Sequence, residues 1–250
     1  MNLRQLLLVN NNCYKAGKKI KPQGIMVHST GANNPWLKRY VGPDDGLLGP
    51  NPNSNHWNTP KPGGRSVCVH AFIGKLKDGS IATYQTLPWD MVGWHSGSGF
   101  LGSAKNANNN GYIGFEICED DLKDPVYFNQ VYREAVELCA YLCKMFNIKP
   151  EEPWLICHSE GYQLGIASNH ADVMHWFPKH GKTMDDFRAD VKKELLKGGT
   201  AVAGKDKPSN WAQEAWEWAK KEGLLDGTRP KDNLTREEFA VVLKKVVDGK

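Results

Sequence analysis

Two short apolar runs, each ending on a histidine, constrain the fold of this chain more than any other feature. They are Gly24-Ile-Met-Val-His28 and Trp154-Leu-Ile-Cys-His158. Apolar runs of this length are typical of buried β-strands. Open α/β sheets place their functional side chains at strand ends. The two runs therefore predict two buried strands that each carry a histidine to an edge of a sheet.

Further strand and helix patterns alternate along the chain. Residues 66–73 and 80–85 read as a hairpin around the turn Lys77-Asp-Gly79, and residues 111–118 read as another strand. Helical spacing of apolar residues covers 128–146 and 184–196. Residues 1–9 are expected to form a strand or short helix, and the Gly-, Pro- and Asn-rich residues 31–65 a long loop. This order predicts an α/β fold with a central mixed sheet flanked by helices.

Bulk properties exclude several classes of protein. A formal net charge of +4 is too small to indicate a nucleic-acid-binding protein. No run approaches the roughly 18 apolar residues of a membrane span. The apolar run at 1–9 is too short for a signal peptide. Six scattered cysteines read as buried free thiols, so we expect synthesis in a reducing cytoplasm.

The strand-end histidines also suggest a metal site. His28, His158 and Asp172 would supply the three protein ligands of a catalytic zinc, which keeps a fourth position open. His170 and His175 remain rival third ligands. The alternative is structural: each histidine could simply be packed, and Asp172 could cap a helix over 173–177.

Glu116 is a carboxylate inside the apolar run Ile113-Gly-Phe-Glu-Ile-Cys118. A buried ionisable group needs a partner or a function. It is interpreted as a general base, with a solvent-facing strand residue as the alternative. A cysteine hydrolase that pairs Cys157 with His158 is disfavoured, because adjacent strand residues point to opposite faces.

Several of these motifs occur in an order that resembles a known family. They are Val27-His-Ser-Thr30, Val69-His-Ala-Phe-Ile73, Gly93-Trp-His-Ser-Gly97, Ile113-Gly-Phe-Glu116, and Cys157-His158 followed by Asp172. Over residues 20–195 the chain resembles the zinc-dependent N-acetylmuramoyl-L-alanine amidases of the type-2 amidase and peptidoglycan-recognition fold. Many of these are phage endolysins and autolysins.

The resemblance implies a role for each matching residue. Zinc would be held by His28, His158 and Asp172, and Glu116 would activate the bound water. His170 stands where many members carry a lysine that stabilises the oxyanion. The residues implied to shape the substrate groove are His70, Trp94 and His95, with loops 31–65 and 103–111 as its walls.

The implied function is hydrolysis of the amide between N-acetylmuramic acid and L-alanine of peptidoglycan, which lyses the cell wall. An endolysin without a signal peptide would reach the wall after release by a holin. The alternative is a peptidoglycan-recognition protein that binds without cutting. Binders of this family lack the cysteine or aspartate ligand, so the presence of Asp172 and Glu116 favours an enzyme.

The C-terminal residues have a pattern of their own. Residues 198–208 read as a flexible linker between a catalytic domain at 1–197 and a small helical module at 209–250. The module resembles one S-layer homology repeat and would bind a secondary cell-wall polymer. Its alternative is a helical hairpin packed on the catalytic domain. Ser209 and the capping box Thr235-Arg-Glu-Glu238 are expected to begin its two helices.

Overall fold

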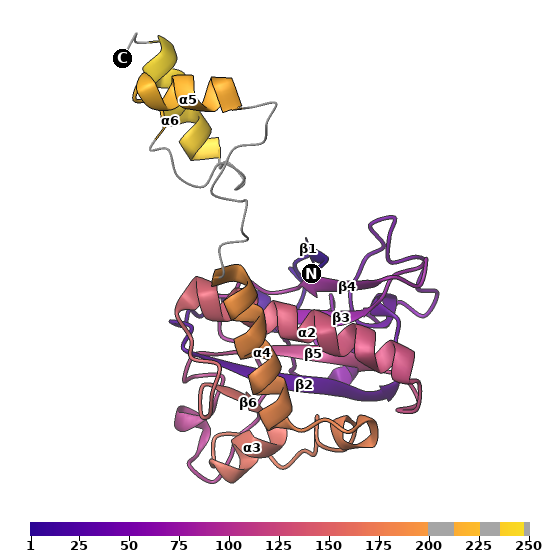
Figure 1. Cartoon of the computed structure of the whole chain (residues 1–250). Helices are drawn as coiled ribbons and strands as arrows, with labels where there is room; N and C mark the ends of the chain where they lie inside the picture. Colours follow the sequence, from indigo (N-terminus) through magenta and orange to yellow (C-terminus); the bar gives the residue numbers. More distant parts are fainter. Residues whose placement is uncertain (200–212, 226–235, 248–250) are drawn as a thin grey trace. The chain divides into compact units, whose positions relative to one another are not determined.

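A six-stranded mixed sheet organises the first of two compact units, residues 1–195 and 196–250 (Figure 1). The computed structural model describes residues 1–199, 213–225 and 236–247. The strand order is β1-β4-β3-β5-β2-β6, in which β3 and β4 are antiparallel and the other neighbours are parallel. The strands are β1 (Leu3–Gln5), β2 (Gly24–Asn33), β3 (Ala71–Lys75), β4 (Ile81–Gln85), β5 (Tyr112–Glu119) and β6 (Leu155–Cys157).

Helices complete the first unit. Both α2 and α4 lie across the same face of the sheet (Figure 1). The short α3 follows β6 directly. The helices of this unit are α1 (Asn12–Ala16), α2 (Pro125–Phe146), α3 (His158–Gln163) and α4 (Met184–Gly199), with 3-10 turns at Leu37–Arg39, Pro62–Gly64, Ser103–Lys105 and Phe177–His180.

The alternation of side chains along each strand separates the core from the functional face. Ile25 and Val27 of β2 join Phe115 of β5 in the main hydrophobic core, together with apolar residues of α2 and α4. Successive strand residues point to opposite faces. His28 and Glu116 therefore lie on the face of the sheet that α2 and α4 leave uncovered.

The expected α/β architecture is confirmed, with shifts at element ends. The strand expected at 66–73 begins only at Ala71, because Cys68 forms an antiparallel bridge with Trp94 instead. Helix α2 begins at Pro125, where the Asp124 side chain accepts hydrogen bonds from the first free backbone N–H groups. His158 does not end β6 but is the first residue of α3.

The second unit contains α5 (Gln213–Lys221) and α6 (Arg236–Val247). Gly223 follows α5 with φ of 69° and donates its N–H to the Lys220 carbonyl, so it ends the helix. The expected caps Ser209 and Thr235, and residues 200–208 of the expected linker, lie outside the described residues. The division at 195/196 lies close to the expected domain boundary, and the wall-binding role of this unit stays a prediction.

Within the described ranges, no helix combines the length and the apolar character that crossing a bilayer requires.

Candidate functional site

A pocket of about 710 Å³ opens on the face of the sheet opposite α2 and α4. The carboxyl ends of parallel β2 and β5 meet there, which is where sheets of this type place their sites. All five residues predicted to carry the chemistry line it: His28, Glu116, His158, His170 and Asp172.

His28 is buried near the end of the regular part of β2, in register with Glu116 of β5. Its Nδ1 lies 3.0 Å from Nδ1 of His158 and 3.1 Å from Oδ2 of Asp172. The remaining pair, His158 Nδ1 and Asp172 Oδ2, is 3.6 Å apart. Three atoms that can donate an electron pair thus converge on one point.

The same three atoms fit a tetrahedral zinc ion. Ligands at 2.0–2.1 Å from a tetrahedral centre lie about 3.3 Å from one another. The observed separations of 3.0, 3.1 and 3.6 Å bracket that value. Within the described parts of the chain, His28, His158 and Asp172 form the one group of three or more histidine, cysteine or carboxylate residues close enough to hold a metal.

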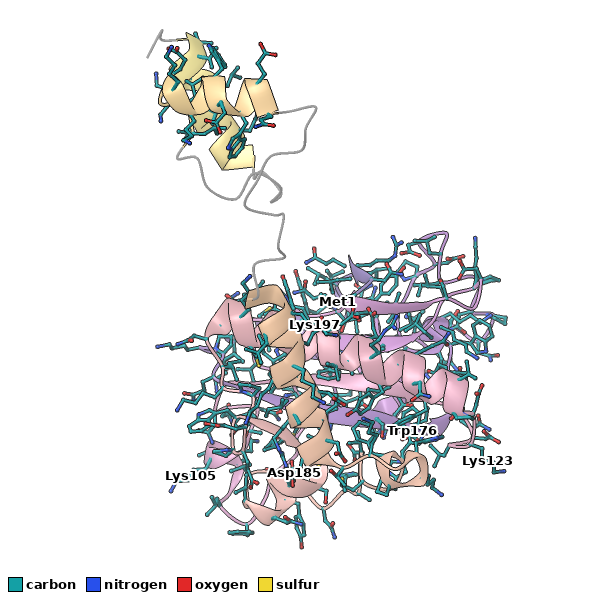
Figure 2. The ribbon with its side chains drawn as sticks, in the orientation of Figure 1. Met1, Lys105, Lys123, Trp176, Asp185 and Lys197 are labelled. Carbon is teal, nitrogen blue, oxygen red and sulfur yellow. The ribbon has the colours of Figure 1, made fainter. Side chains whose placement is uncertain are left out.

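The start of α3 is fixed by a partly buried ion pair, which positions His158. Glu160 accepts a hydrogen bond from the Cys157 N–H and is held by Arg188 of α4 at 2.9 Å. Arg188 also binds Asp185, labelled in Figure 2 at the first turn of α4. The bidentate contact between Arg188 and Glu160 restricts rotation of both side chains. The backbone that carries the His158 imidazole is therefore held in place at the start of α3.

Electrostatics favour metal-binding protonation states. Burial, followed by the charge of His28, lowers the pKa of His158 to about 3, which keeps its imidazole neutral. Burial by itself would raise the pKa of Asp172. The hydrogen bond and charge of His28 outweigh that effect and lower the pKa to about 2. A neutral imidazole and an ionised carboxylate are the forms that bind zinc.

Glu116 borders the pocket without a hydrogen-bond partner for its buried Oε2. Burial, and then the nearby Asp172 and Glu119 carboxylates, raise its pKa well above the ordinary value. Carboxylates tuned in this way are typical of general acids and bases. The structure thus places Glu116 beside the three candidate metal ligands, with one buried oxygen that has no hydrogen-bond partner.

His170 lies at the exposed rim of the pocket. Its ring centroid is 4.5 Å from that of His158, and Ser168 Oγ lies 3.1 Å from its Nδ1. The other rival third ligand, His175, is instead paired through Nε2 with Glu119 Oε1 at 2.9 Å. Neither belongs to the group of converging ligand atoms.

The three predicted groove residues have different positions. Trp94 and His95 line the pocket. His70 is fully buried and lies behind the wall, so its assignment to the substrate groove is wrong. Its ring nitrogens are satisfied by backbone groups: Nδ1 accepts from the Gly114 N–H and Nε2 donates to the Met91 carbonyl. Burial lowers its pKa to about 4.

Loop residues contribute much of the remaining lining. Trp57 and Arg65 come from the loop expected at 31–65, and Asn106 and Asn108 from the loop expected at 103–111. Ser168 lies between His158 and His170, with Oγ 3.4 Å from His158 Nε2. Ser168 could not be singled out from the sequence, because a serine in an irregular segment carries no periodic signal.

The cysteine alternative is not supported by the structure. Cys157 is fully buried, and burial raises the pKa of its thiol to about 12. A thiol in that environment stays protonated and is a poor nucleophile. All six cysteines are buried and free, as the sequence predicts.

Solved structures share this fold at low sequence identity. The PlyG catalytic domain is 18% identical, with a TM-score of 0.53 over 78% of this chain and 96% of that one. The catalytic domain of XlyA is 22% identical, with a TM-score of 0.51 over 76% of this chain and 99% of that one. The Staphylococcus aureus hydrolase AmiA, solved with its ligand, is 18% identical, with a TM-score of 0.51 over 80% of this chain and 86% of that one.

Comparison with curated proteins gives no significant match. A family model does match the chain. Residues 18–178, well over half of the sequence, match the model of the Amidase_2 family, described as N-acetylmuramoyl-L-alanine amidase. The matched range includes every residue that lines the pocket. The chain therefore belongs to the Amidase_2 family of N-acetylmuramoyl-L-alanine amidases.

Proposed function

We propose that this protein is a zinc-dependent peptidoglycan amidase. It hydrolyses the amide that joins the lactyl group of N-acetylmuramic acid to L-alanine of the stem peptide. The observation that carries the proposal is the convergence of His28 Nδ1, His158 Nδ1 and Asp172 Oδ2 beside Glu116, in a chain of the Amidase_2 family. Zinc bound by these three residues would supply Lewis-acid chemistry and lower the pKa of a water to about 7.

Glu116 acts as the general base. Its carboxylate, which lines the pocket, accepts a proton from the attacking water, and the protonated carboxyl then delivers that proton to the leaving amine. The raised pKa of Glu116 suits both steps, because the protonated form is readily reached after the first transfer. The desolvation cost of placing the Glu116 carboxylate here is therefore explained by its role in turnover.

His170 stabilises the oxyanion from the rim of the pocket. Ser168 Oγ is within hydrogen-bond distance of its Nδ1, which leaves Nε2 as the ring atom available to donate to substrate. A protonated His170 would donate a charge-assisted hydrogen bond. This geometry allows histidine to serve where related amidases carry lysine.

The second unit attaches the enzyme to the wall. In the described part of this unit, Trp218 of α5 and Phe239 of α6 are each 55% exposed. Such residues suit contacts with the sugar rings of a secondary cell-wall polymer. The catalytic unit supplies the cleavage, and the second unit raises the local concentration of the enzyme at its substrate.

The test is mass spectrometry of purified cell walls after digestion. The expected product is a stem peptide with a free L-alanine amino group, together with glycan strands that retain intact muramic acid. Wall binding without any such product would indicate the alternative function, peptidoglycan recognition without cleavage. Glu116→Gln protein serves as the inactive control in the same digest.

A further inference from the structure

Three histidines, His28, His95 and His70, form a row that runs from the pocket into the core, and this row carries an inference about the metal site. It rests on the proposed zinc site but concerns a residue that is not a ligand. His28 Nε2, on the side of the ring away from the converging ligand atoms, lies 3.0 Å from Nδ1 of His95. His95 Nε2 in turn lies 3.1 Å from the carbonyl oxygen of Tyr112. The contacts form a chain from a metal ligand to the backbone of β5.

The backbone end of this chain fixes where each proton lies. A carbonyl oxygen can only accept, so His95 Nε2 carries the proton that binds Tyr112. A neutral imidazole has one N–H, so His95 Nδ1 is the acceptor. The proton between the two rings therefore belongs to His28 Nε2. In the neutral imidazole that metal binding requires, His28 Nδ1 then bears the lone pair, directed at the point where Asp172 Oδ2 and His158 Nδ1 converge.

A doubly protonated His95 is disfavoured by its surroundings. It would place a cation next to two other imidazoles, His28 and His70, whose ring centroids are 5.0 and 6.0 Å away. Among the described residues, no carboxylate is hydrogen-bonded to the His95 ring. A buried cation without a counter-charge carries a large desolvation penalty.

The position of the His95 ring is restricted by glycine packing. A Cβ atom at Gly114 would lie 2.4 Å from His95 Cγ, and one at Gly93 would lie 2.7 Å from His95 Cδ2. Both distances are too short for a real contact, so only glycine at these two positions leaves room for the His95 ring. The backbone N–H of His95 donates to Asn108 Oδ1 at 3.1 Å. His95 thus has little freedom to turn away from His28.

We propose that His95 is a positioning residue for the metal site. It holds the His28 ring in one orientation and in the Nε2–H tautomer, which presents Nδ1 to zinc. Histidine ligands of metals commonly donate their second N–H to a carboxylate, a carbonyl or water, and loss of that partner costs about 10–100-fold in metal affinity or activity. Here His95 takes the place of that partner. Its own hydrogen bond to the Tyr112 carbonyl holds the His95 ring in position.

The first arm of the experiment measures zinc affinity by competition with a chromophoric chelator. His95→Leu removes the acceptor, and its affinity should fall about 10–100-fold. His95→Asn places an amide oxygen close to the former Nδ1 position and should recover most of the loss. His70→Asn is the matched control, since His70 is fully buried in the same row but touches no metal ligand through a hydrogen bond. It should lower thermal stability and leave zinc affinity unchanged.

The second arm uses nitrogen-15 NMR on the intact wild-type protein, which does not depend on a variant folding. A nitrogen–nitrogen coupling through the hydrogen bond should join His28 Nε2 to His95 Nδ1, with the proton on His28. Folded His95→Leu protein with wild-type zinc affinity would overturn the proposal, as would a proton on His95 Nδ1. Wall cleavage is measured separately, so zinc binding with this coupling but without cleavage contradicts only the proposed function.

Discussion

His28 and Glu116 occupy the same register position on neighbouring parallel strands, β2 and β5. This pairing places a candidate metal ligand and the proposed base on the same face of the sheet, at the edge where the pocket opens. Because both strands are buried on their other face by the main core, the distance between the two side chains is set by the sheet and not by a loop. Rigid elements of this kind hold catalytic groups more accurately than loops do.

Zinc should be required for activity. The purified protein is expected to hold about one zinc ion per chain, and a strong chelator should abolish lysis until zinc is restored. Asp172→Ala should lose metal and activity together, because two imidazoles alone make an incomplete site. Metal analysis of wild-type and variant protein tests this. Retention of zinc by Asp172→Ala, with loss in His175→Ala, would identify His175 as the third ligand.

Glu116→Gln should keep the fold and the zinc but lose about 10²–10⁴-fold in turnover, which is the usual contribution of a general base. Glu119→Gln is the matched control three residues along the same strand. Glu119 is already paired with His175 and with the Gly31 N–H, so Glu119→Gln should lower turnover less than Glu116→Gln does. A near-normal rate for Glu116→Gln with zinc bound would show that Glu116 is structural.

The pH profile gives a second test of Glu116. The base must be ionised, so activity should fall as the pH drops through its pKa. Because burial, and then the nearby carboxylates, raise that pKa, the acid limb of kcat/KM should lie above about 4.3, the ordinary value for glutamate. The wild-type profile measured on a soluble muramoyl-peptide tests this. An acid limb at or below the ordinary value would argue against the buried base.

His170→Ala should bind zinc normally and turn over slowly. Its ring touches His158 but lies outside the group of converging ligand atoms, so the loss is that of one oxyanion donor. Removal of one such donor costs about 10²–10³-fold in kcat. His170→Lys should restore much of the rate, because lysine supplies a donor at the same place. Loss of zinc from His170→Ala would instead make His170 a ligand.

The pKa of His70, lowered by burial to about 4, predicts a loss of stability in acid. The unfolded chain, with an ordinary pKa of about 6.5, binds the proton first as the pH falls. Stability from this residue is complete above about pH 6.5 and declines toward pH 4, by about 3 kcal/mol in total. Urea unfolding in chelator between pH 7.5 and 5 should show a shallower decline for His70→Asn. Equal declines would contradict the burial effect.

The residues that converge in the pocket could be predicted from the sequence better than the contacts around them. His28 and His158 could be found because an apolar run that ends on histidine is typical of a buried strand that carries a polar side chain to a sheet edge. Spacing could not separate Asp172 from its rivals His170 and His175, since the segment from Ser159 to Asp172 has no regular period; the family resemblance favoured Asp172. The contact between His28 and His95 could not be predicted at all. It depends on the path of the chain between β4 and β5, where glycine residues and an asparagine side chain set the backbone.

The same limit accounts for the error at His70. A histidine within an apolar run reads equally well as a pocket residue or a core residue. The choice depends on which backbone groups face its two nitrogens. In this fold the Gly114 N–H faces one ring nitrogen of His70 and the Met91 carbonyl faces the other. The hydrogen-bonding needs of the ring are therefore met without solvent or substrate.

The second unit should direct the enzyme to walls without taking part in cleavage. A chain that ends at Gly198 keeps the whole first compact unit, so it should fold, bind zinc and cleave a soluble muramoyl-peptide at close to the full-length rate. It should bind intact walls less well and lyse cells more slowly. The deficit should grow with salt, as weak electrostatic attraction between the remaining unit and the wall is screened.

Trp218→Ala in the full-length protein tests whether one exposed side chain of the second unit contributes to wall binding, without removing the unit as a whole. Trp218 is 55% exposed on α5, so its removal should weaken wall binding while zinc content and the soluble-substrate rate stay unchanged. Sedimentation of each variant with purified walls, before and after removal of their secondary polymers, provides the measurement. If the truncated and full-length chains bind walls equally, the second unit has no targeting role and is better interpreted as a stabilising or self-associating helical hairpin.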